Sequence, residues 1–159
     1  MFKKLLTTRS LCLSAVIAAL YAALTLLLAP LSFGPLQLRL SEAMTLLPMI
    51  LPQAIPGLFV GCLIANLYTG MLTDIIFGSM ATLIAAIGTY LLRKKPILAA
   101  ACPVVANGVI VGLVLALTSN LPIALIMAQV AIGEIGAVAI GMVILCAMKR
   151  AKVDLTRLS

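Results

Sequence analysis

The sequence predicts an all-α integral membrane protein with six transmembrane helices, folded as a single domain over residues 1–159, with a short, proline-broken second helix. Hydrophobic residues make up 64% of the 159 residues and charged residues only 9%, whereas a soluble domain has about 45–50% apolar and about 25% charged residues. The cations are clustered, and polar breaks separate long apolar runs. A membrane span needs about 20 residues, so the length allows about six helices with short loops.

The first helix is expected over residues 10–29, where an apolar run ends at Pro30 and the turn-forming sequence Ser-Phe-Gly-Pro at 32–35. The alternative is a signal peptide, because Lys3 and Lys4 precede the apolar run. The run is longer than the usual apolar segment of a signal peptide, about 7–15 residues, and apolar sequence soon resumes. We therefore expect this helix to be retained.

Three more helices follow in the second half of the chain. One is expected over residues 72–92, ending at the basic turn 93–96, and another over residues 97–118. The break Ser-Asn-Leu-Pro at 119–122 then begins a last helix that runs to Met148. Each of these runs is long enough to cross a bilayer.

The stretch 41–69 holds Pro48, Pro52 and Pro56 at intervals of four residues. A proline inside a helix removes a backbone donor and clashes with the preceding turn, so we expect a helical hairpin here, not one long helix. Its first arm, residues 40–51, would extend only about 18 Å as an α-helix, too short to cross a bilayer. Irregular backbone at membrane depth requires surrounding protein or a water-filled cavity, so this arm suggests a cavity.

The cations give the orientation. If the stretch 41–69 crosses twice, ten of the eleven cations fall on one side, which the positive-inside rule makes cytoplasmic. This selects six helices in the cell membrane with both termini cytoplasmic, and places Arg39, Glu42 and Asp74 toward the outside. The three clusters are Lys3, Lys4 and Arg9; Arg93, Lys94 and Lys95; and Lys149, Arg150, Lys152 and Arg157.

Several classes of function are disfavoured. The chain has no histidine and no GxSxG, Walker A or HExxH pattern, so we expect no enzyme, no cofactor and no metal site. The basic clusters are explained by membrane topology, so we expect no nucleic-acid partner. The four cysteines stand singly in apolar stretches and are interpreted as small buried hydrophobes: Cys12, Cys62, Cys102 and Cys146.

Polar residues inside the apolar runs are the candidate substrate-binding residues. Glu134 lies about 18 Å into the last helix, near mid-membrane, where a charge normally faces a cavity or a partner. Asn107 lies at a similar depth, whereas Asn66 and Gln129 lie nearer the outside. Amides read mixed donor and acceptor edges, but they also bond helices together without any ligand, and that alternative stays open.

Charge adds a second argument for a ligand. Arg39, Glu42, Asp74 and Glu134 are left after the cytoplasmic residues are removed, and they carry a formal charge of −2. This favours a ligand that is cationic or rich in hydrogen-bond donors. Alternatively, Arg39 and Glu42, three residues apart, pair with each other.

Small residues form seams along several helices. Glycine and alanine recur at intervals of four in the runs 57–61, 108–112 and 133–141, a spacing that lets helices pack closely. The first helix has two adjacent alanine faces, either of which can meet another protein: Ala15, Ala19 and Ala23; and Ala18 and Ala22.

Three segments carry a family resemblance: Arg-Leu-Ser-Glu-Ala-Met-Thr-Leu-Leu-Pro from residue 39, Ala-Ile-Pro-Gly-Leu-Phe-Val-Gly-Cys-Leu-Ile-Ala-Asn from residue 54, and Asp-Ile-Ile-Phe-Gly-Ser-Met-Ala-Thr-Leu from residue 74. With them the chain resembles the QueT family, substrate-binding S components of energy-coupling factor transporters. The resemblance covers nearly the whole chain in length and helix order. The first two segments are the more specific, and the later helices match less distinctively.

The resemblance implies a six-helix S-component bundle that binds a queuosine precursor, a deazaguanine base, and works with a membrane scaffold protein and two cytoplasmic ATPases. It also implies that an alanine face of the first helix meets the scaffold. Glu134 would then accept the guanine-like edge, Asn107 would read a carbonyl or ring nitrogen, and Glu42 or Asp74 would hold an aminomethyl cation. Separately, Gly34 and its flanking prolines predict that the loop 31–40 closes over a ligand taken from outside.

Two rival functions stay open. The first is an S component or carrier for another small solute, such as a vitamin or nucleobase. The second is a membrane scaffold subunit that binds no solute.

Overall fold

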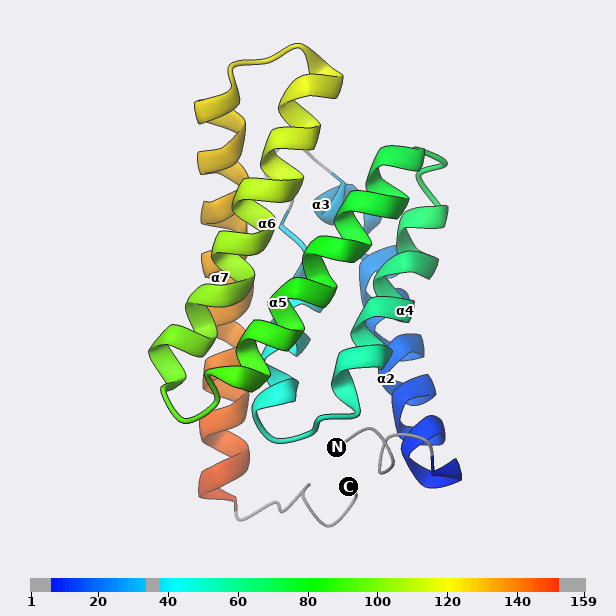
Figure 1. Cartoon of the computed structure of the whole chain (residues 1–159), viewed down its shortest axis with the longest axis vertical. Helices are drawn as coiled ribbons and strands as arrows, with labels where there is room; N and C mark the ends of the chain where they lie inside the picture. Colours follow the sequence, from blue (N-terminus) through cyan, green and yellow to red (C-terminus); the bar gives the residue numbers. More distant parts are fainter. Residues whose placement is uncertain (1–6, 34–37, 152–159) are drawn as a thin grey trace.

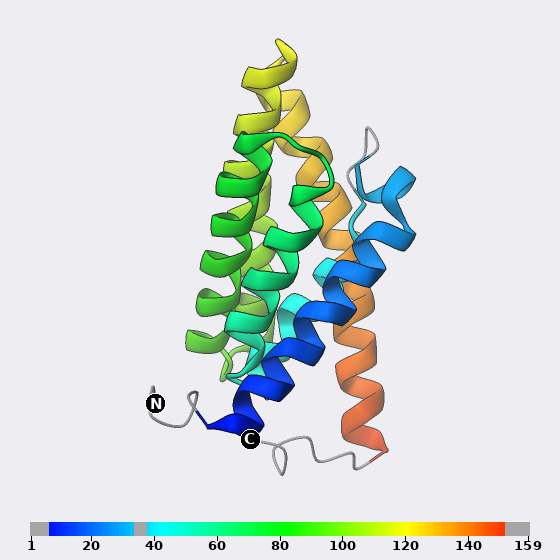
Figure 2. The ribbon, with the colours of Figure 1, turned by 90° about the vertical axis from the view of Figure 1, so that its right-hand side faces the viewer.

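The computed structural model describes residues 7–33 and 38–151, and every regular element in them is helical (Figures 1 and 2). Neighbouring helices run up and down between two ends of an elongated bundle. In chain order the elements are α2 (Thr8–Leu27), α3 (Ala29–Ser32), the 3₁₀ helix η1 (Leu40–Met49), α4 (Ala54–Leu67), the π-helical turn η2 (Asp74–Gly78), α5 (Ser79–Leu91), α6 (Pro96–Ser119) and α7 (Ile123–Arg150).

Within the described residues, four helical segments are long and apolar enough to cross a membrane. They are Thr8–Leu27, Asp74–Leu91, Pro96–Ser119 and Ile123–Arg150. This confirms the predicted membrane class. The helix α4 has 14 residues and η1 has 10, so the count of six crossings stays a prediction.

The three prolines place the hairpin where the sequence predicts it. Pro48 lies inside η1, Pro52 lies in the turn after it, and Pro56 lies in the first turn of α4. The first turn of an α-helix tolerates proline because its N–H groups have no partner inside the helix. The short arm is a 3₁₀ helix over Leu40–Met49, slightly shorter than the predicted 40–51. It contacts α2, α4, α5, α6 and α7, so it lies in the middle of the bundle.

Two helices differ in detail from the sequence prediction. The first helix ends at Leu27 instead of Ala29, and Pro30 lies in the first turn of the short helix α3, where a proline is favoured. The helix predicted from residue 72 does begin there, but Asp74–Gly78 form the π-helical turn η2 before α5 starts at Ser79. Sequence periodicity over five residues does not distinguish a π turn from an α turn.

The glycine seams are used inside the bundle, as predicted. A Cβ at Gly57 would lie 2.7 Å from the Ser14 carbonyl oxygen, and one at Gly61 would lie 2.8 Å from the Ala18 carbonyl oxygen. On the other side, a Cβ at Gly112 would lie 2.7 Å from the Met127 Cα. Glycine therefore sets the close approach of α2 to α4 and of α6 to α7.

The two alanine faces of α2 have different surroundings. Ala18 and Ala22 are buried, and Ala18 lies against the α4 seam. Ala15, Ala19 and Ala23 are exposed on the outside of the bundle.

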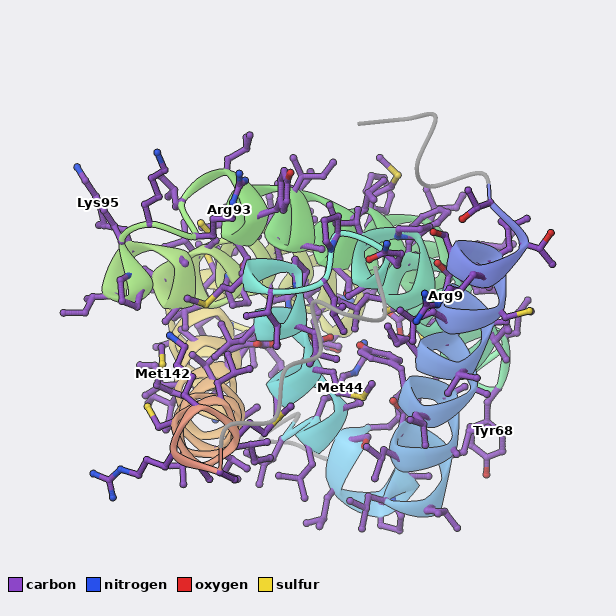
Figure 3. All side chains as sticks on the ribbon, turned by 90° about the horizontal axis from the view of Figure 1, so that it is seen from below. Arg9, Met44, Tyr68, Arg93, Lys95 and Met142 are labelled. Atoms are coloured by element: carbon purple, nitrogen blue, oxygen red, sulfur yellow. The ribbon has the colours of Figure 1, made fainter. Side chains whose placement is uncertain are left out.

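Apart from Arg39, the described basic residues gather at one end of the molecule. Arg9 at the start of α2 and Arg93 and Lys95 in the α5–α6 turn are seen together from below in Figure 3. Lys149 and Arg150 end α7 at this same end (Figure 1). The remaining cations of the clusters, Lys3, Lys4, Lys152 and Arg157, lie outside the described residues.

The interpretation of the cysteines as buried hydrophobes is wrong for two of them. Cys62 is fully buried and Cys102 is partly buried, but Cys12 and Cys146 are exposed on the outer surface of α2 and α7. An apolar run of a membrane helix has the same composition toward lipid and toward protein, so composition alone did not reveal which side each thiol takes.

Candidate functional site

A cluster of polar side chains lies in the interior of this apolar bundle. We call it the polar centre, and each of its members has at most 6% of its side chain exposed. Five long helices and η1, with the residue before it, contribute to it: Tyr21 from α2, Arg39 and Glu42 at η1, Cys62 and Asn66 from α4, Thr82 from α5, Asn107 from α6 and Glu134 from α7. Hydrocarbon-like surroundings make such groups costly to bury without partners, so their contacts define what the site can do.

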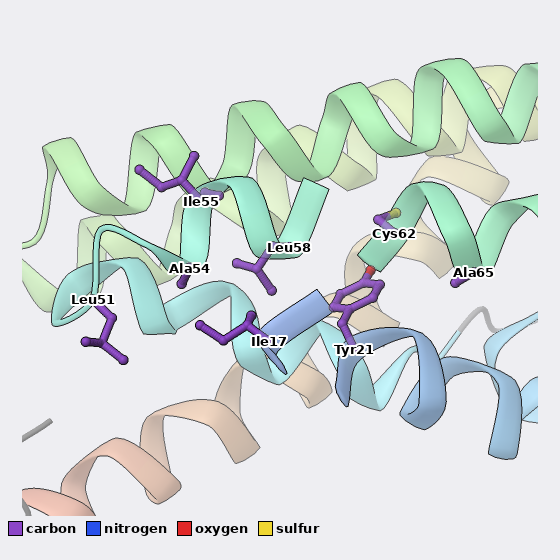
Figure 4. Packing of buried hydrophobic residues seen from close by; sticks show 9 residues of the cluster. Ile17, Tyr21, Leu51, Ala54, Ile55, Leu58, Cys62 and Ala65 are labelled. Carbon is purple, nitrogen blue, oxygen red and sulfur yellow. The ribbon is translucent and has the colours of Figure 1, made fainter. Parts of the chain in front are cut away.

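Glu42 is held from two neighbouring helices. The hydroxyl group of Tyr21 donates to Glu42 Oε1, and the hydroxyl of Thr82 lies 3.4 Å from the same oxygen, sharing its one hydrogen with the Gly78 carbonyl. Figure 4 shows the Tyr21 ring reaching from α2 toward α4, with its hydroxyl on the side of Cys62. The second carboxylate oxygen, Glu42 Oε2, is buried and has no hydrogen-bond partner among the described residues.

Glu134 has one partner, on the neighbouring helix α6. Asn107 Nδ2 donates to Glu134 Oε1 at 2.8 Å. Glu134 Oε2 and Asn107 Oδ1 are both buried without a partner in the described part of the chain. The Asn107 side chain also lies within interaction range of the Glu42 carboxylate, and the two carboxylates act on each other electrostatically. The two acids therefore belong to one site.

Arg39 completes the centre from the outer side. Its Nη2 donates to Asn66 Oδ1 at 3.0 Å, its Nη1 lies 3.9 Å from Cys62 Sγ, and its guanidinium carbon lies 5.2 Å from the centre of the Phe33 ring. The Nε–H group is left without a partner among the described residues. The alternative of a simple Arg39–Glu42 pair is not favoured, because the guanidinium turns to Asn66 and Cys62.

Asn66 fixes the direction of Arg39. Its Nδ2 donates to the Asp74 carbonyl oxygen at 2.8 Å, so its Oδ1 must face the guanidinium. Gly78 makes room for this contact, since a Cβ there would lie 2.8 Å from Asn66 Nδ2. All the hydrogen-bonding atoms of Asn66 are therefore occupied by the protein, unlike those of Asn107.

The structure brings together five of the seven residues that the sequence predicts for substrate binding: Glu134, Asn107, Glu42, Arg39 and Asn66. Asp74 is half-buried at the start of η2, where its backbone meets Asn66 and its charge acts on Arg39. Gln129 is half-buried on α7 and has no hydrogen bond to a described residue. Part of the predicted closing loop, residues 34–37, lies outside the described residues.

Sequence reasoning missed Tyr21 and Thr82, and it gave Cys62 no polar role. Tyr21 had a usable signal, because a phenol in the middle of an apolar membrane helix needs a partner for its hydroxyl. Thr82 had none, since a membrane helix can satisfy a threonine hydroxyl with its own backbone, as Thr82 also does with the Gly78 carbonyl at 3.2 Å.

The unpartnered atoms show what the polar centre can bind. Three are acceptors, namely Glu42 Oε2, Glu134 Oε2 and Asn107 Oδ1, and one is a donor, Arg39 Nε–H. A buried polar group without a partner costs about 1–3 kcal/mol, so a ligand that completes these bonds is strongly favoured. The complementary ligand has several donors, at least one acceptor and no negative charge.

Comparison with known proteins gives the family. The sequence model of the QueT transporter family matches residues 11–150. A protein of Lactococcus lactis subsp. cremoris (strain MG1363), named queuosine precursor transporter QueT, is 35% identical over 72 residues, which cover 44% of this chain and 43% of that protein. The match therefore spans less than half the length of this relative. No solved structure matches the chain.

Proposed function

Because the chain belongs to the QueT transporter family, a family of multi-pass membrane proteins, we propose that it is the substrate-binding S component of an energy-coupling factor importer. In this role it captures a queuosine precursor, a deazaguanine base, from outside. A membrane scaffold protein and two cytoplasmic ATPases then supply the energy that delivers the base inward.

The pattern of unpartnered atoms in the polar centre carries the proposal. A deazaguanine base presents a ring N–H and an exocyclic NH₂ side by side, with a carbonyl next to the ring N–H. Glu134 Oε2 and Asn107 Oδ1 are two acceptors from one hydrogen-bonded pair, and Arg39 Nε–H is the free donor. Two of the three acceptors match the N–H and NH₂ groups of the guanine-like edge, and the donor matches its carbonyl. The third acceptor, Glu42 Oε2, is left for another group of the ligand.

The contacts of each residue support a division of roles. Glu134 reads the N–H and NH₂ groups, Asn107 adds its free oxygen, and Arg39 donates to the carbonyl. Glu42 Oε2 is the remaining acceptor and takes an aminomethyl group where the base carries one. Asp74 and Gln129 are only half-buried, unlike the members of the polar centre, so both are assigned outside the direct contacts.

The partner surface is proposed on α2. Ala18 and Ala22 are buried inside the bundle, so the free small-residue face is the one formed by Ala15, Ala19 and Ala23. With the basic end of the bundle cytoplasmic, six crossings put both termini on the side of the ATPases. The first described residues of the predicted closing loop, 31–33, lie toward the opposite end of the bundle (Figure 2), on the side from which the base arrives.

A binding panel tests the proposed function. The detergent-solubilised chain is measured by thermal shift and by calorimetry with 7-deazaguanine, 7-aminomethyl-7-deazaguanine, guanine and a set of vitamins. We expect stabilisation by a deazaguanine, about 2.7 kcal/mol at 100 times its dissociation constant, and none by vitamins. Stabilisation by a vitamin alone, or by no compound, would contradict the proposal.

Coupling to partners is tested separately. Ala19→Leu is expected to block uptake in vesicles that also contain the scaffold and ATPases, while leaving the affinity of the solubilised chain for the base unchanged. Ala139→Leu, at an exposed position on α7, is the matched control and is expected to transport normally. Equal uptake by both variants would remove the proposed docking face.

A further inference from the structure

The polar centre has one more negative than positive group. Arg39, Glu42 and Glu134 are its charged members, so one cation faces two carboxylates, a formal charge of −1. The other elements around it contribute the neutral phenol of Tyr21 from α2, the neutral thiol of Cys62 from α4, and uncharged Thr82 and Asn107 from α5 and α6. Asp74 at η2 is half-exposed and acts on Arg39 from the outer side.

The single cation, Arg39, forms no hydrogen bond with either carboxylate. The guanidinium of Arg39 bonds Asn66 and approaches Cys62 and the Phe33 ring. Each carboxylate keeps one buried oxygen free of any partner in the described chain. Two carboxylates that act on each other in a buried site cannot both stay ionised without compensation, so one proton or one ligand cation has to restore the balance.

We propose that the polar centre selects its ligand by charge: it holds a donor-rich base with one positive charge while both acids are ionised, and it retains one proton when it holds the same base without that charge. The inference rests on the proposed function for the identity of the base. The ammonium of an aminomethyl group then lies against Glu42 Oε2, since Glu134 and Asn107 take the edge of the ring.

The proposal fixes how the two affinities change with pH. The charged base binds the form of the site without the proton, and the neutral base binds the form with it. The two complexes differ by one bound proton, so the ratio of their association constants rises tenfold for each unit of pH. An alkylammonium group titrates near lysine, at about 10.4, so the ligand keeps its charge below about pH 8.

The experiment compares 7-aminomethyl-7-deazaguanine with 7-deazaguanine on the full solubilised chain between about pH 6 and pH 8. We expect the affinity ratio to rise about 100-fold over this range. Calorimetry in buffers of different ionisation enthalpy counts the protons directly: relative to the charged base, the neutral base is expected to bind with about one more proton. A ratio that does not change with pH would overturn the charge proposal and leave the proposed function intact, provided both bases bind. If neither base binds, the proposed function fails, and this inference fails with it.

Two variants locate the charge. Glu42→Gln leaves Arg39 opposite Glu134 alone, so the centre is formally neutral, and the affinity ratio is expected to lose its dependence on pH. Asp74→Asn, which removes the half-exposed acid, is the matched control and is expected to keep the tenfold change per unit. Loss of the slope in Asp74→Asn with its retention in Glu42→Gln would overturn the assignment to Glu42.

Discussion

The two buried acids of this protein are held in different ways. Glu42 lies on the short 3₁₀ helix in the middle of the bundle, and hydroxyl groups from α2 and α5 share its Oε1. Glu134 lies within the longest helix, α7, and has one amide partner, which itself keeps a free oxygen. Glu42 thus joins several elements of the fold, whereas the Glu134–Asn107 pair leaves two adjacent acceptors for a ligand. Although the two acids are equally buried, Glu42 mainly holds the fold together and Glu134 mainly offers acceptors to a ligand.

Glu134→Gln is the change expected to have the largest effect on binding. The variant side chain can still accept from Asn107 through its oxygen. Its amide NH₂ then stands in place of the free oxygen Oε2, where it faces the donor groups of the ligand and cannot accept from them. We expect the affinity for 7-deazaguanine to fall about 100-fold, or about 2.7 kcal/mol. Calorimetry on the solubilised chain measures this.

The thermal stability of the empty Glu134→Gln protein is the control. It should not fall, because the substitution removes a buried charge and keeps the shape of the side chain. An affinity within threefold of the parent, a change below about 0.7 kcal/mol, would show that Glu134 does not read the base.

Tyr21→Phe tests whether Glu42 joins elements of the fold as well as contacting the ligand. It removes one of the two hydroxyl groups that hold Glu42 and leaves the ring in place. We expect the affinity for the aminomethyl base to fall about tenfold, or about 1.4 kcal/mol. We also expect a lower melting temperature, because a hydrogen bond to a charged group contributes about 1.5–3 kcal/mol to stability.

Tyr90→Phe is the matched control for this change. Tyr90 is only partly buried, and its ring lies under the Arg93 guanidinium at the basic end of the bundle, so neither stability nor affinity should move. If Tyr21→Phe altered affinity without altering the melting temperature, Glu42 would be a pure ligand contact and the contrast with Glu134 would be lost.

Much of this contrast could be predicted from the sequence. The depth of Glu134 and Asn107 along their helices follows from residue counting, and the prolines at 48, 52 and 56 predict the hairpin that carries Glu42 into the bundle. The rotation of each helix could not be predicted, because lipid-facing and buried sides are equally apolar. For this reason Thr82 could not be placed in the site and Cys12 and Cys146 were assigned to the wrong side, whereas the phenol of Tyr21, which needs a hydrogen-bond partner in an apolar helix, could have been included.

Asn66→Leu is expected to have a smaller effect, because Asn66 acts through Arg39. The substitution removes the acceptor of Arg39 Nη2, so the guanidinium is no longer held in one orientation. It also leaves the Asp74 carbonyl without its donor. We expect a fall in affinity of about fivefold, or about 1 kcal/mol, for every base that has the ring carbonyl. Asn66→Asp keeps an acceptor for Arg39 but loses the donor to the Asp74 carbonyl, so it should recover only part of the lost affinity. If Asn66→Leu bound every base as tightly as the parent, Asn66 would not orient Arg39 toward the ring carbonyl.

Gln129→Leu should have the smallest effect and marks where the site ends on α7. Gln129 precedes Glu134 by five residues, which is about 140° around an α-helix, so the two side chains leave the helix in different directions. It is half-buried and bonds no described residue. We expect the affinity for either base to stay within twofold, below about 0.4 kcal/mol, as measured by calorimetry beside Glu134→Gln. A loss above tenfold would extend the ligand toward the outer turns of α7, and Glu134 would then be one contact of a longer surface instead of the acceptor that reads the base.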